Sequence, residues 1–519
     1  MRNARDEAIW ARLGSQRGSV LLAAYLVIMV LLFLGAAFLV ISSHEGRIAD
    51  NQRKIIQAFY IAEAGIEQAI YDLRQDILVN PANAKWSDGI TIGGTTYGPD
   101  TAAFYNVYIN VPFPSGTYAN SFSVSGTNDY TVSFKNAAGT EDVWVRSTGR
   151  VDGLSQTIEI YARMVNLSPW DNAIFGGAGS SGAMVNGNVN IRGSVHILGE
   201  GLNDGDNAID LGGTAELVGN HYNIGNPQGL DAALAAKVPA LPTTVFNGET
   251  VSTLNAELRV KKGLVGLSGN SVVGEANISG NSVKETVDGT YVTDGYNGTK
   301  GASGVYSDNG ATEGYDLGDA VTFPSLSDPF PANPSQDYYQ YFNDNALVLT
   351  TELNNVTPNS NFTLGDCSSN CITMDGNGNL HITGMIYVSA DNNLSITSGN
   401  FQYTGKGTVL VTGNATIDAN LVTAGNNSFP TNILGIMTPN NINIGTSSQK
   451  DIMGLFYAEG TIATYKQTDI VGTLVTNYFN VSSQVPSVFQ VPESVNHLPP
   501  GMIAGEPIWL VKVVAWRKI

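Results

Sequence analysis

The sequence predicts an α+β, mainly β protein. In it, a long transmembrane-plus-amphipathic helix precedes a β-meander and then a solenoid resembling a parallel β-helix. Three observations predict this fold class. An uncharged apolar run, residues 20–41, continues into an apolar stripe with helical spacing. Residues 88–165 alternate between apolar and polar side chains in short bursts. From residue 169 onward, short apolar triplets are punctuated by Gly and Asn.

Composition limits the classes of protein that fit. A chain of 519 residues is too long for one ordinary core, so two or more domains are expected. The net charge of -19, with 26 Lys and Arg against 45 Asp and Glu, argues against a nucleic-acid partner. The 58 glycines and the low charged fraction of 14% favour a turn-rich β protein outside the cytoplasm over a cytosolic α/β enzyme. Two cysteines cannot form the main scaffold.

The apolar run from Val20 to Ile41 is long enough to cross a bilayer of about 30 Å as a helix. A secretory signal has a shorter apolar core of about 7–15 residues and a small-residue cleavage site after it. Arginines dominate the preceding segment, so the positive-inside rule keeps residues 1–18 in the cytoplasm and sends the chain after Ser43 outward. We therefore expect a single-pass precursor in the inner (cytoplasmic) membrane.

The helix is expected to continue beyond the membrane. Apolar side chains recur at gaps of three, four and seven, at Ile48, Ile55, Phe59, Ala62, Ile66, Ala69, Leu73 and Ile77. Asn80-Pro81 then supplies a stop signal. Residues 19–78 are predicted to form one helix of about 90 Å, half in lipid and half in water.

Two short tracts resemble type IV prepilins. The segment "RGSVLL" at residues 17–22 looks like a prepilin processing site, and "AFYIAEA" at residues 58–64 is similar to the pattern that follows the membrane helix in PilX-type minor pilins. The resemblance covers residues 16–80. It implies cleavage after Gly18 by a prepilin peptidase, methylation of the new amine on Ser19, and packing of this helix among major and other minor pilins. Phe59, Ala62 and Glu63 are expected also to form a helix face that packs on the protein's own head, because pilin helices do both.

One position departs from the major-pilin pattern. The fifth residue of the mature chain is usually glutamate in major pilins, and here it is Ala23. This fits a minor subunit at the pilus tip that supports assembly, adhesion or surface display, with a tip adhesin among its candidate partners. The alternatives are a minor pseudopilin of a type II secretion system and a membrane-anchored β-helical adhesin or polysaccharide-active protein.

Four domains follow from these patterns. They are a cytoplasmic leader (1–18), the pilin-type helix (19–80), a pilin-like β head (81–168) and a β-helix-like domain (169–519). A β-sandwich is the competing fold for the last domain. Insertions are expected at 226–242 with a short helix, at 288–316 as a loop, and at 323–344. The aromatic side chains of 323–344 are expected to cover the solenoid's flank, with an exposed contact surface as the alternative. The tail from Pro507 is expected to form a final strand that closes an end of the solenoid.

The repeat alignment underlying the solenoid has two sets of equivalent apolar positions. The first set is Val388, Val411, Ile436, Phe456 and Val475, with spacings of 23, 25, 20 and 19 residues. The second set follows about six residues later, at Leu394, Ile417, Ile442 and Ile462. Such spacings are typical of coils that stack about 4.8 Å apart.

The sequence offers little for catalysis. The five histidines have no metal-ligand spacing, and no nucleophile elbow or phosphate loop is present, so we expect no enzyme and no cofactor. Cys367 and Cys371 are expected to form a small disulfide outside the cytoplasm, with a metal pair as the alternative. Asp375, Asn377 and Asn379 resemble the start of a calcium loop, and a plain turn is the preferred interpretation.

Overall fold

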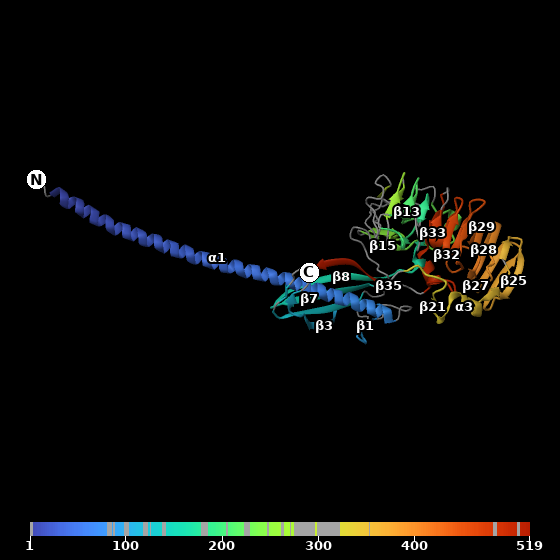
Figure 1. The fold of residues 1–519 in the computed structure, drawn as a ribbon, viewed down its shortest axis with the longest axis horizontal. Helices are drawn as coiled ribbons and strands as arrows, with labels where there is room; N and C mark the ends of the chain where they lie inside the picture. The colour runs from blue at the N-terminus through green and yellow to red at the C-terminus, as the bar shows by residue number, and fades with distance from the viewer. Residues whose placement is uncertain are drawn as a thin grey trace. The chain divides into compact units, whose positions relative to one another are not determined.

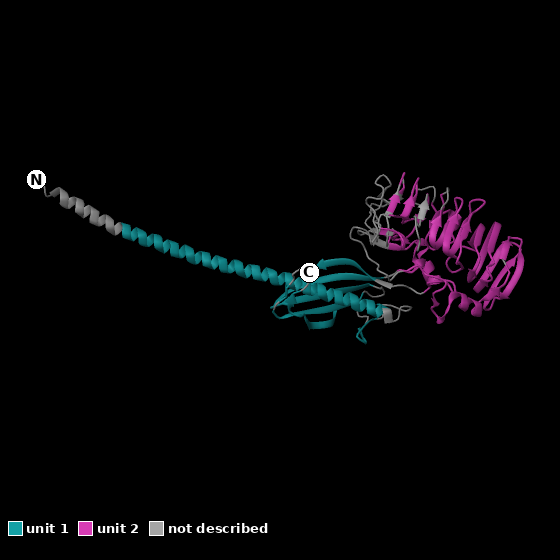
Figure 2. Ribbon diagram, viewed as in Figure 1, with its two compact units in different colours: residues 1–165, 509–519 teal, residues 166–508 magenta. Residues whose placement is uncertain are grey.

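A computed structural model of the chain separates into two compact units, residues 1–165 with 509–519 and residues 166–508 (Figure 2). The described backbone comprises 4–79, 86, 89–97, 103–117, 123–124, 126–136, 142–177, 185–203, 206–222, 229–246, 249–260, 264–269, 271–274, 296–297, 322–351, 353–480, 485–505 and 509–519. Within this backbone, side chains are described from Val20 onward, except those of residues 78–79, 165–166, 185–187, 244–246, 249, 251, 264, 267, 272, 296–297 and 509–510.

Unit 1 is built on the helix α1, which runs without a break from Ala4 to Val79 (Figure 1). It begins earlier than the residue 19 expected from the sequence and ends next to Asn80-Pro81, as predicted. Every side chain from Val20 to Ala49 is exposed, whereas Ala58, Ile61 and Ala62 are fully buried. One helix thus has an exposed apolar half and a half that packs on a sheet.

The sheet of unit 1 has the order β3-β6-β7-β8-β35, and β3 to β8 pair antiparallel, as the predicted meander requires. Its inward side chains join those of α1 in one core that includes Ile66, Leu73, Phe134, Val145 and Ile160. The strands of this unit are β1 (Ile90–Ile92), β2 (Thr95–Tyr97), β3 (Tyr105–Pro112), β4 (Gly116–Thr117), β5 (Ser123–Val124), β6 (Asn128–Asn136), β7 (Asp142–Val151), β8 (Leu154–Asn166) and β35 (Trp509–Lys518).

Two glycines let the helix approach the sheet closely. A Cβ added to Gly149 of β7 would lie 2.5 Å from the backbone nitrogen of Ala62 and would also overlap the carbonyl oxygen of Ala58. A Cβ on Gly65 of the helix would overlap the hydroxyl of Ser147. Because backbone atoms of α1 fill the space above Gly149, no larger residue fits there without moving the helix.

The C-terminal strand lies elsewhere than expected. β35 joins β8 in the sheet of unit 1, and the amide of Ile519 donates to the carbonyl of Thr157 at 3.0 Å. On the outward face, Glu159 accepts hydrogen bonds from both Arg146 of β7 and Arg517 of β35. The tail therefore does not close the repeat region, contrary to expectation. Residues 509–519 return to the sheet of unit 1, so the domain expected at 169–519 ends at residue 508.

Unit 2 consists mainly of three parallel ladders of strands, here called ladders A, B and C. Ladder A has the order β17-β12-β9-β33-β32-β30-β28-β27-β23. Ladder B has the order β18-β13-β10-β33-β32-β31-β29-β28-β24. Ladder C has the order β19-β14-β11-β34-β33-β32-β29-β28-β27. The long strands β28, β32 and β33 contribute to all three ladders.

The strands of these ladders are mostly short. They are β9 (Ile174–Gly176), β10 (Val185–Gly187), β11 (Asn190–Arg192), β12 (Val195–Ile197), β13 (Asn207–Leu211), β14 (Glu216–Gly219), β17 (Leu258–Val260), β18 (Leu264–Leu267), β19 (Val272–Val273), β23 (Leu347–Leu349), β24 (Leu353–Val356), β27 (Asn379–Val388), β28 (Leu394–Val411), β29 (Ala415–Thr423), β30 (Ile433–Thr438), β31 (Ile442–Ile444), β32 (Asp451–Thr464), β33 (Asp469–Asn480) and β34 (Ser487–Phe489). Along ladder C, fully buried apolar side chains stack on one another, at Phe401, Leu421, Ile452, Ile470, Val488 and Ile191.

The expected repeat alignment is right at some steps and wrong at others. Val388 pairs with Val411, Ile436 with Phe456 and Ile442 with Ile462, as aligned. Two steps differ by two residues on either side of Ile417, which pairs with Ile396 and Ile444 and not with Leu394 and Ile442. Ile436 pairs with Val409 and not with Val411. Phe456 pairs with Leu474 and not with Val475. The expected pairing is wrong by one or two residues at these steps. Turn lengths vary between layers, and neighbouring apolar residues fit the same repeat pattern, so the sequence does not fix which of them pair.

Asparagines join successive turns between ladders A and B. The Oδ1 atom of Asn393 accepts from the amide of Asn414 at 2.8 Å, and that of Asn414 accepts from the amide of Asn441 at 3.2 Å. Asn441 in turn accepts from the amide of Thr461 at 2.8 Å. Each side chain thus satisfies a backbone donor of the next layer, which explains the Asn-rich punctuation in the sequence.

The chain enters and leaves unit 2 at the same place along the ladders. The first strand, β9, pairs with β33 on one side and with β12 on the other. The 3-10 helix η3 (Pro169–Asp171) is bonded to the closing segment, because the Trp170 indole donates to the carbonyl of Ile503 at 2.6 Å. Gln490, which precedes the 3-10 helix η6 (Pro492–His497), donates to the carbonyl of Asp171 at 3.0 Å. Both ends of the insertion therefore meet, which suits its place between β8 and β35 in the sequence.

The remaining elements are short. They are the helices α2 (Ala232–Ala235) and α3 (Tyr338–Asn345) and the strands β15 (Thr243–Phe246), β16 (Glu249–Ser252), β20 (Tyr296–Asn297), β21 (Pro329–Phe330), β22 (Asn333–Asp337), β25 (Asn361–Asp366) and β26 (Asn370–Asp375). The short helix expected within 226–242 is α2. The loop expected at 288–316 lies almost wholly outside the described residues. In the segment 323–344, Phe323 stacks on Phe175 and Tyr457, and Phe342 is fully buried, so these aromatic side chains cover the ladders.

Candidate functional site

The first candidate site is the exposed apolar half of α1. In the part of the chain that the structure describes, this is the one helix long and apolar enough to span a membrane, with a mean hydropathy of 2.9 in its most apolar window. Leu22, Phe33 and Leu39 are each about 70% exposed. So large a continuous apolar surface is unstable in water and needs lipid or other apolar helices around it.

Gly18 and Ser19 lie within α1. Their side chains and surroundings are outside the described residues, so cleavage after Gly18 and methylation of Ser19 stay predictions. Ala23, the fifth residue of the predicted mature chain, is exposed.

The residues of the PilX-type pattern pack on the protein's own sheet. Ala58 and Ala62 are fully buried. Phe59 is half-buried, with its ring centroid 6.1 Å from that of Trp516 and the Lys518 ammonium 5.5 Å from the ring centre. Glu63 is partly exposed at the helix edge, where burial and then the nearby Glu67 raise its pKa. Ala58, Phe59 and Ala62 therefore pack on the protein's own head, as expected, and their packing among other pilins stays a prediction.

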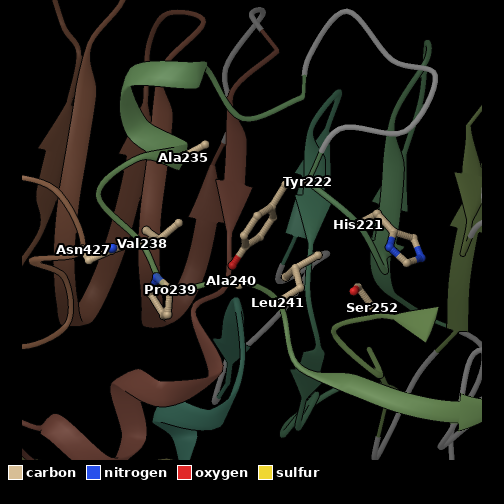
Figure 3. Close-up of a pocket in the computed structure, with 9 residues that line it drawn as sticks. All are labelled: His221, Tyr222, Ala235, Val238, Pro239, Ala240, Leu241, Ser252 and Asn427. Carbon is tan, nitrogen blue, oxygen red and sulfur yellow. The ribbon is translucent and has the colours of Figure 1, made fainter. Parts of the chain in front are cut away.

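Unit 2 contains an open cleft of about 570 Å³ (Figure 3). It is lined by His221, Tyr222, Ala235, Val238, Pro239, Ala240, Leu241, Ser252 and Asn427. The segment after α2 is held in place because the Lys237 ammonium donates to the carbonyl of Thr423 at 2.5 Å and the Asn427 amide donates to the carbonyl of Ala236 at 2.9 Å. Burial raises the pKa of Tyr222, whose hydroxyl donates to the carbonyl of Gln490. None of the nine lining residues that the structure describes carries a carboxylate.

The third candidate site contains the two cysteines. Cys367 and Cys371 are disulfide-bonded across the turn of the β25–β26 hairpin, with their Cα atoms 4.8 Å apart. His381 of β27 joins them, and the sulfur and imidazole ligand atoms all lie within 4.8 Å of one another. The sequence shows no metal-ligand spacing between a histidine and these cysteines, yet the fold places His381 beside them. Only the antiparallel pairing of β26 with β27 brings His381 back to the hairpin.

The Asp375 segment forms a turn. The Oδ1 atom of Asp375 accepts from the amides of Asn377 and Asn379, and its Oδ2 atom accepts from the Asn379 side chain at 2.7 Å. The Asn379 side chain, followed by the backbone of Asn377, lowers the pKa of Asp375 to about 2. Both carboxylate oxygens of Asp375 thus accept hydrogen bonds within the turn itself. This arrangement agrees with the plain turn, which the sequence favours over a calcium loop.

Comparisons with known proteins assign no family. No family model and no curated protein matches the chain. Among solved structures, the chain is similar to the competence-associated pilin ComZ from Thermus thermophilus, with 19% identity and a TM-score of 0.48 over 89% of this chain and 97% of that one. Identity and TM-score at these levels do not establish a shared function.

Proposed function

We propose that this protein is a minor pilin of the PilX type that is stored in the inner membrane and then incorporated at the tip of a type IV pilus. The observation that carries the proposal is the division of α1. Its residues 20–41 are apolar and exposed, and its residues 58–77 form the core of the protein's own head. A helix anchored in this way can leave lipid for a bundle of similar helices while the head keeps its fold.

The proposed mechanism begins at the inner face of the membrane. A prepilin peptidase cuts the peptide bond after Gly18, and the amine of Ser19 becomes the mature, methylated N-terminus. The apolar segment then moves from lipid into contact with major and other minor pilins. The "RGSVLL" tract and the length of the apolar segment support this sequence of events.

Unit 2 is proposed to be a parallel β-helix that displays a surface outside the cell for assembly or adhesion. The three parallel ladders and their stacked apolar interior support this fold over a β-sandwich, whose sheets are antiparallel. We propose no catalytic role for this unit.

The test is a pair of leader variants. Gly18→Glu places a bulky charge directly before the cleaved bond and is expected to leave an uncleaved precursor that stays in the membrane and does not enter pili. Gly14→Glu introduces the same residue four positions earlier and is expected to mature normally. N-terminal sequencing and intact mass of both proteins are the measurements.

The proposal fails if the natural protein begins at Met1, or if it begins beyond Ser43 with the apolar segment removed. A native chain that begins at Ser19 but copurifies with a secretion complex and not with pili would favour the pseudopilin alternative. Release of oligosaccharides from a polysaccharide by the full chain in detergent would favour the polysaccharide-active alternative.

A further inference from the structure

The β25–β26 hairpin gathers two sulfur atoms and one imidazole on one face of the sheet. Cys371 of β26 lies directly opposite Thr383 of β27, and His381 lies two residues before Thr383 on the same strand. Directly opposed residues and residues two apart share a face, so Cys371, Thr383 and His381 point to the same side. Cys371 is fully buried there, beneath the exposed Cys367 to which it is bonded.

The His381 ring has a defined orientation in this cluster. Its Nδ1 atom lies 3.0 Å from the hydroxyl of Thr404 on β28, and its Nε2 atom lies 3.1 Å from the hydroxyl of Thr383. Because β27 runs between β26 and β28, Nδ1 faces away from the cysteines and Nε2 lies on their side. A proton on Nδ1, donated to Thr404, leaves the lone pair of Nε2 to accept from the Thr383 hydroxyl, a hydrogen bond that a metal ion held by the cysteines would replace. Metal-binding histidines are commonly fixed through the other ring nitrogen in this way.

We propose that Cys367, Cys371 and His381 form a redox-gated Zn²⁺ site. Two cysteine sulfurs and one histidine nitrogen are ligands that Zn²⁺ favours over Ca²⁺ or Mg²⁺, and tetrahedral coordination leaves the fourth position to water. While the disulfide is intact, both sulfurs are neutral and bonded to each other, so the site is closed to metal.

The opening step is a two-electron reduction by an external dithiol. The S–S bond breaks, each sulfur takes up one electron and one proton, and the dithiol is oxidised to its own disulfide. A Zn²⁺ ion then displaces the two thiol protons, binds both thiolates and accepts the lone pair of His381 Nε2. The turn of the hairpin is thereby cross-linked in both states, by sulfur when oxidised and by metal when reduced.

The location gives this cross-link a structural purpose. β26 pairs antiparallel with residues 380–383 of β27, and those residues pair in parallel with β28 on the other side. The hairpin therefore covers the edge at which ladder C ends, and an uncovered strand edge is prone to pair with other chains. Holding the turn closed under reducing conditions would keep that edge protected.

The test uses the full chain in detergent micelles and Co²⁺ as a coloured substitute for Zn²⁺. The chain is reduced with a phosphine, freed of reductant without exposure to air, and titrated with Co²⁺. The reduced chain is expected to bind one Co²⁺ with a thiolate-to-cobalt charge-transfer band and tetrahedral d–d bands, all of which disappear when Zn²⁺ is added. The oxidised chain is expected to give neither band.

Two variants distinguish the proposed site from binding by the thiols alone. His381→Ala is expected to weaken Co²⁺ binding about tenfold or more and to shift the d–d bands. His497→Ala removes a similarly half-buried histidine of η6 in the same unit and is expected to change neither. Circular dichroism checks that both variants are folded.

A reduced wild-type chain without the charge-transfer band would overturn the proposal. So would a folded His381→Ala chain with wild-type affinity and spectrum. If His381→Ala does not fold, Thr404→Val provides the same test, because loss of the Nδ1 partner is expected to weaken Co²⁺ binding several-fold while the charge-transfer band persists. Wild-type affinity in Thr404→Val would then contradict the site.

Discussion

The two units bury their apolar side chains in different ways. In unit 1, a single helix covers one face of an antiparallel sheet, so residues such as Ile66 and Leu73 share one core with side chains from all five strands of that sheet. In unit 2, each layer of the parallel ladders rests on the layers before and after it, as Ile470 rests between Ile452 and Val488.

This difference determines how far a local defect should spread. A change that lifts α1 removes one entire side of the core of unit 1, so its effect should reach every strand of that sheet. A change in one layer of unit 2 should weaken mainly that layer and its neighbours, because repeat structures are stabilised by nearest-neighbour contacts. Hydrogen exchange read peptide by peptide can measure both patterns.

The largest effect is expected from Gly149→Val. The new side chain would collide with backbone atoms of α1 at Ala58 and Ala62, and backbone cannot move aside as a flexible side chain can. We expect unit 1 to lose at least about 3 kcal/mol of its free energy of unfolding, with faster exchange throughout β6, β7 and β8. Thermal unfolding and hydrogen exchange of the full chain in detergent are the measurements.

Gly46→Val is the matched control. Gly46 lies on the exposed part of α1, and a Cβ there would meet nothing within 4 Å. We expect its stability to change little. Equal losses in both variants, or exchange that increases in β7 alone, would contradict the view that unit 1 depends on one continuous helix–sheet contact.

A smaller, local effect is expected from Asn441→Ala in unit 2. Its side chain accepts the amide hydrogen of Thr461 in the next layer at 2.8 Å, so the variant loses one hydrogen bond between layers. We expect a loss of about 1 kcal/mol, with faster exchange confined to the turns near residues 414, 441 and 461. Asn426→Ala, at an exposed turn position, is the control. Exchange that increases across all layers would refute local coupling.

The smallest effect concerns a stacked pair of aspartates. Asp469 pairs with Asp451 on ladder C, and burial, followed by the Asp451 carboxylate, raises the pKa of Asp469 to about 6. Native unit 2 thus holds a proton that the unfolded chain releases near pH 4. The resulting stabilisation is complete below pH 4 and is lost as the pH rises through about 6.

Asp469→Asn should therefore stabilise unit 2 at pH 7 by up to about 1 kcal/mol and should have no such advantage at pH 4. Unfolding curves at the two pH values provide the measurement. Asp210→Asn removes an exposed carboxylate from the same unit and controls for the change in net charge. A gain at pH 4 as large as that at pH 7 would rule out the ionised pair as the cause.

Local patterns predicted much of the architecture. The apolar run, the helical stripe and the Asn80-Pro81 stop predicted the course of α1, and alternation predicted the antiparallel strands of the head. Periodic triplets predicted stacked apolar side chains in unit 2. Each of these features depends on residues a few positions apart, so a short segment of the sequence is enough to recognise it.

Other features depend on residues that are distant in the sequence. The pairing of β35 with β8, and the two arginines that meet at Glu159, join segments separated by the whole of unit 2. Register within the ladders was misjudged by one or two residues where turns differ in length. The closeness of His381 to the two cysteines follows from the pairing of β26 with β27, for which the sequence carries no signal.

By itself, the sequence determined that this protein has a membrane-length helix, a half-buried continuation of that helix and a Gly- and Asn-punctuated series of short strands. Hydrophobic periodicity and turn-forming residues act over a few positions, so both can be recognised in the sequence without knowledge of the fold. Only the tertiary structure decided which strand completes the first sheet, which residues stack between layers and which imidazole faces the disulfide. Those contacts are selected by packing and hydrogen bonding between distant segments, so they exist only once the chain has folded.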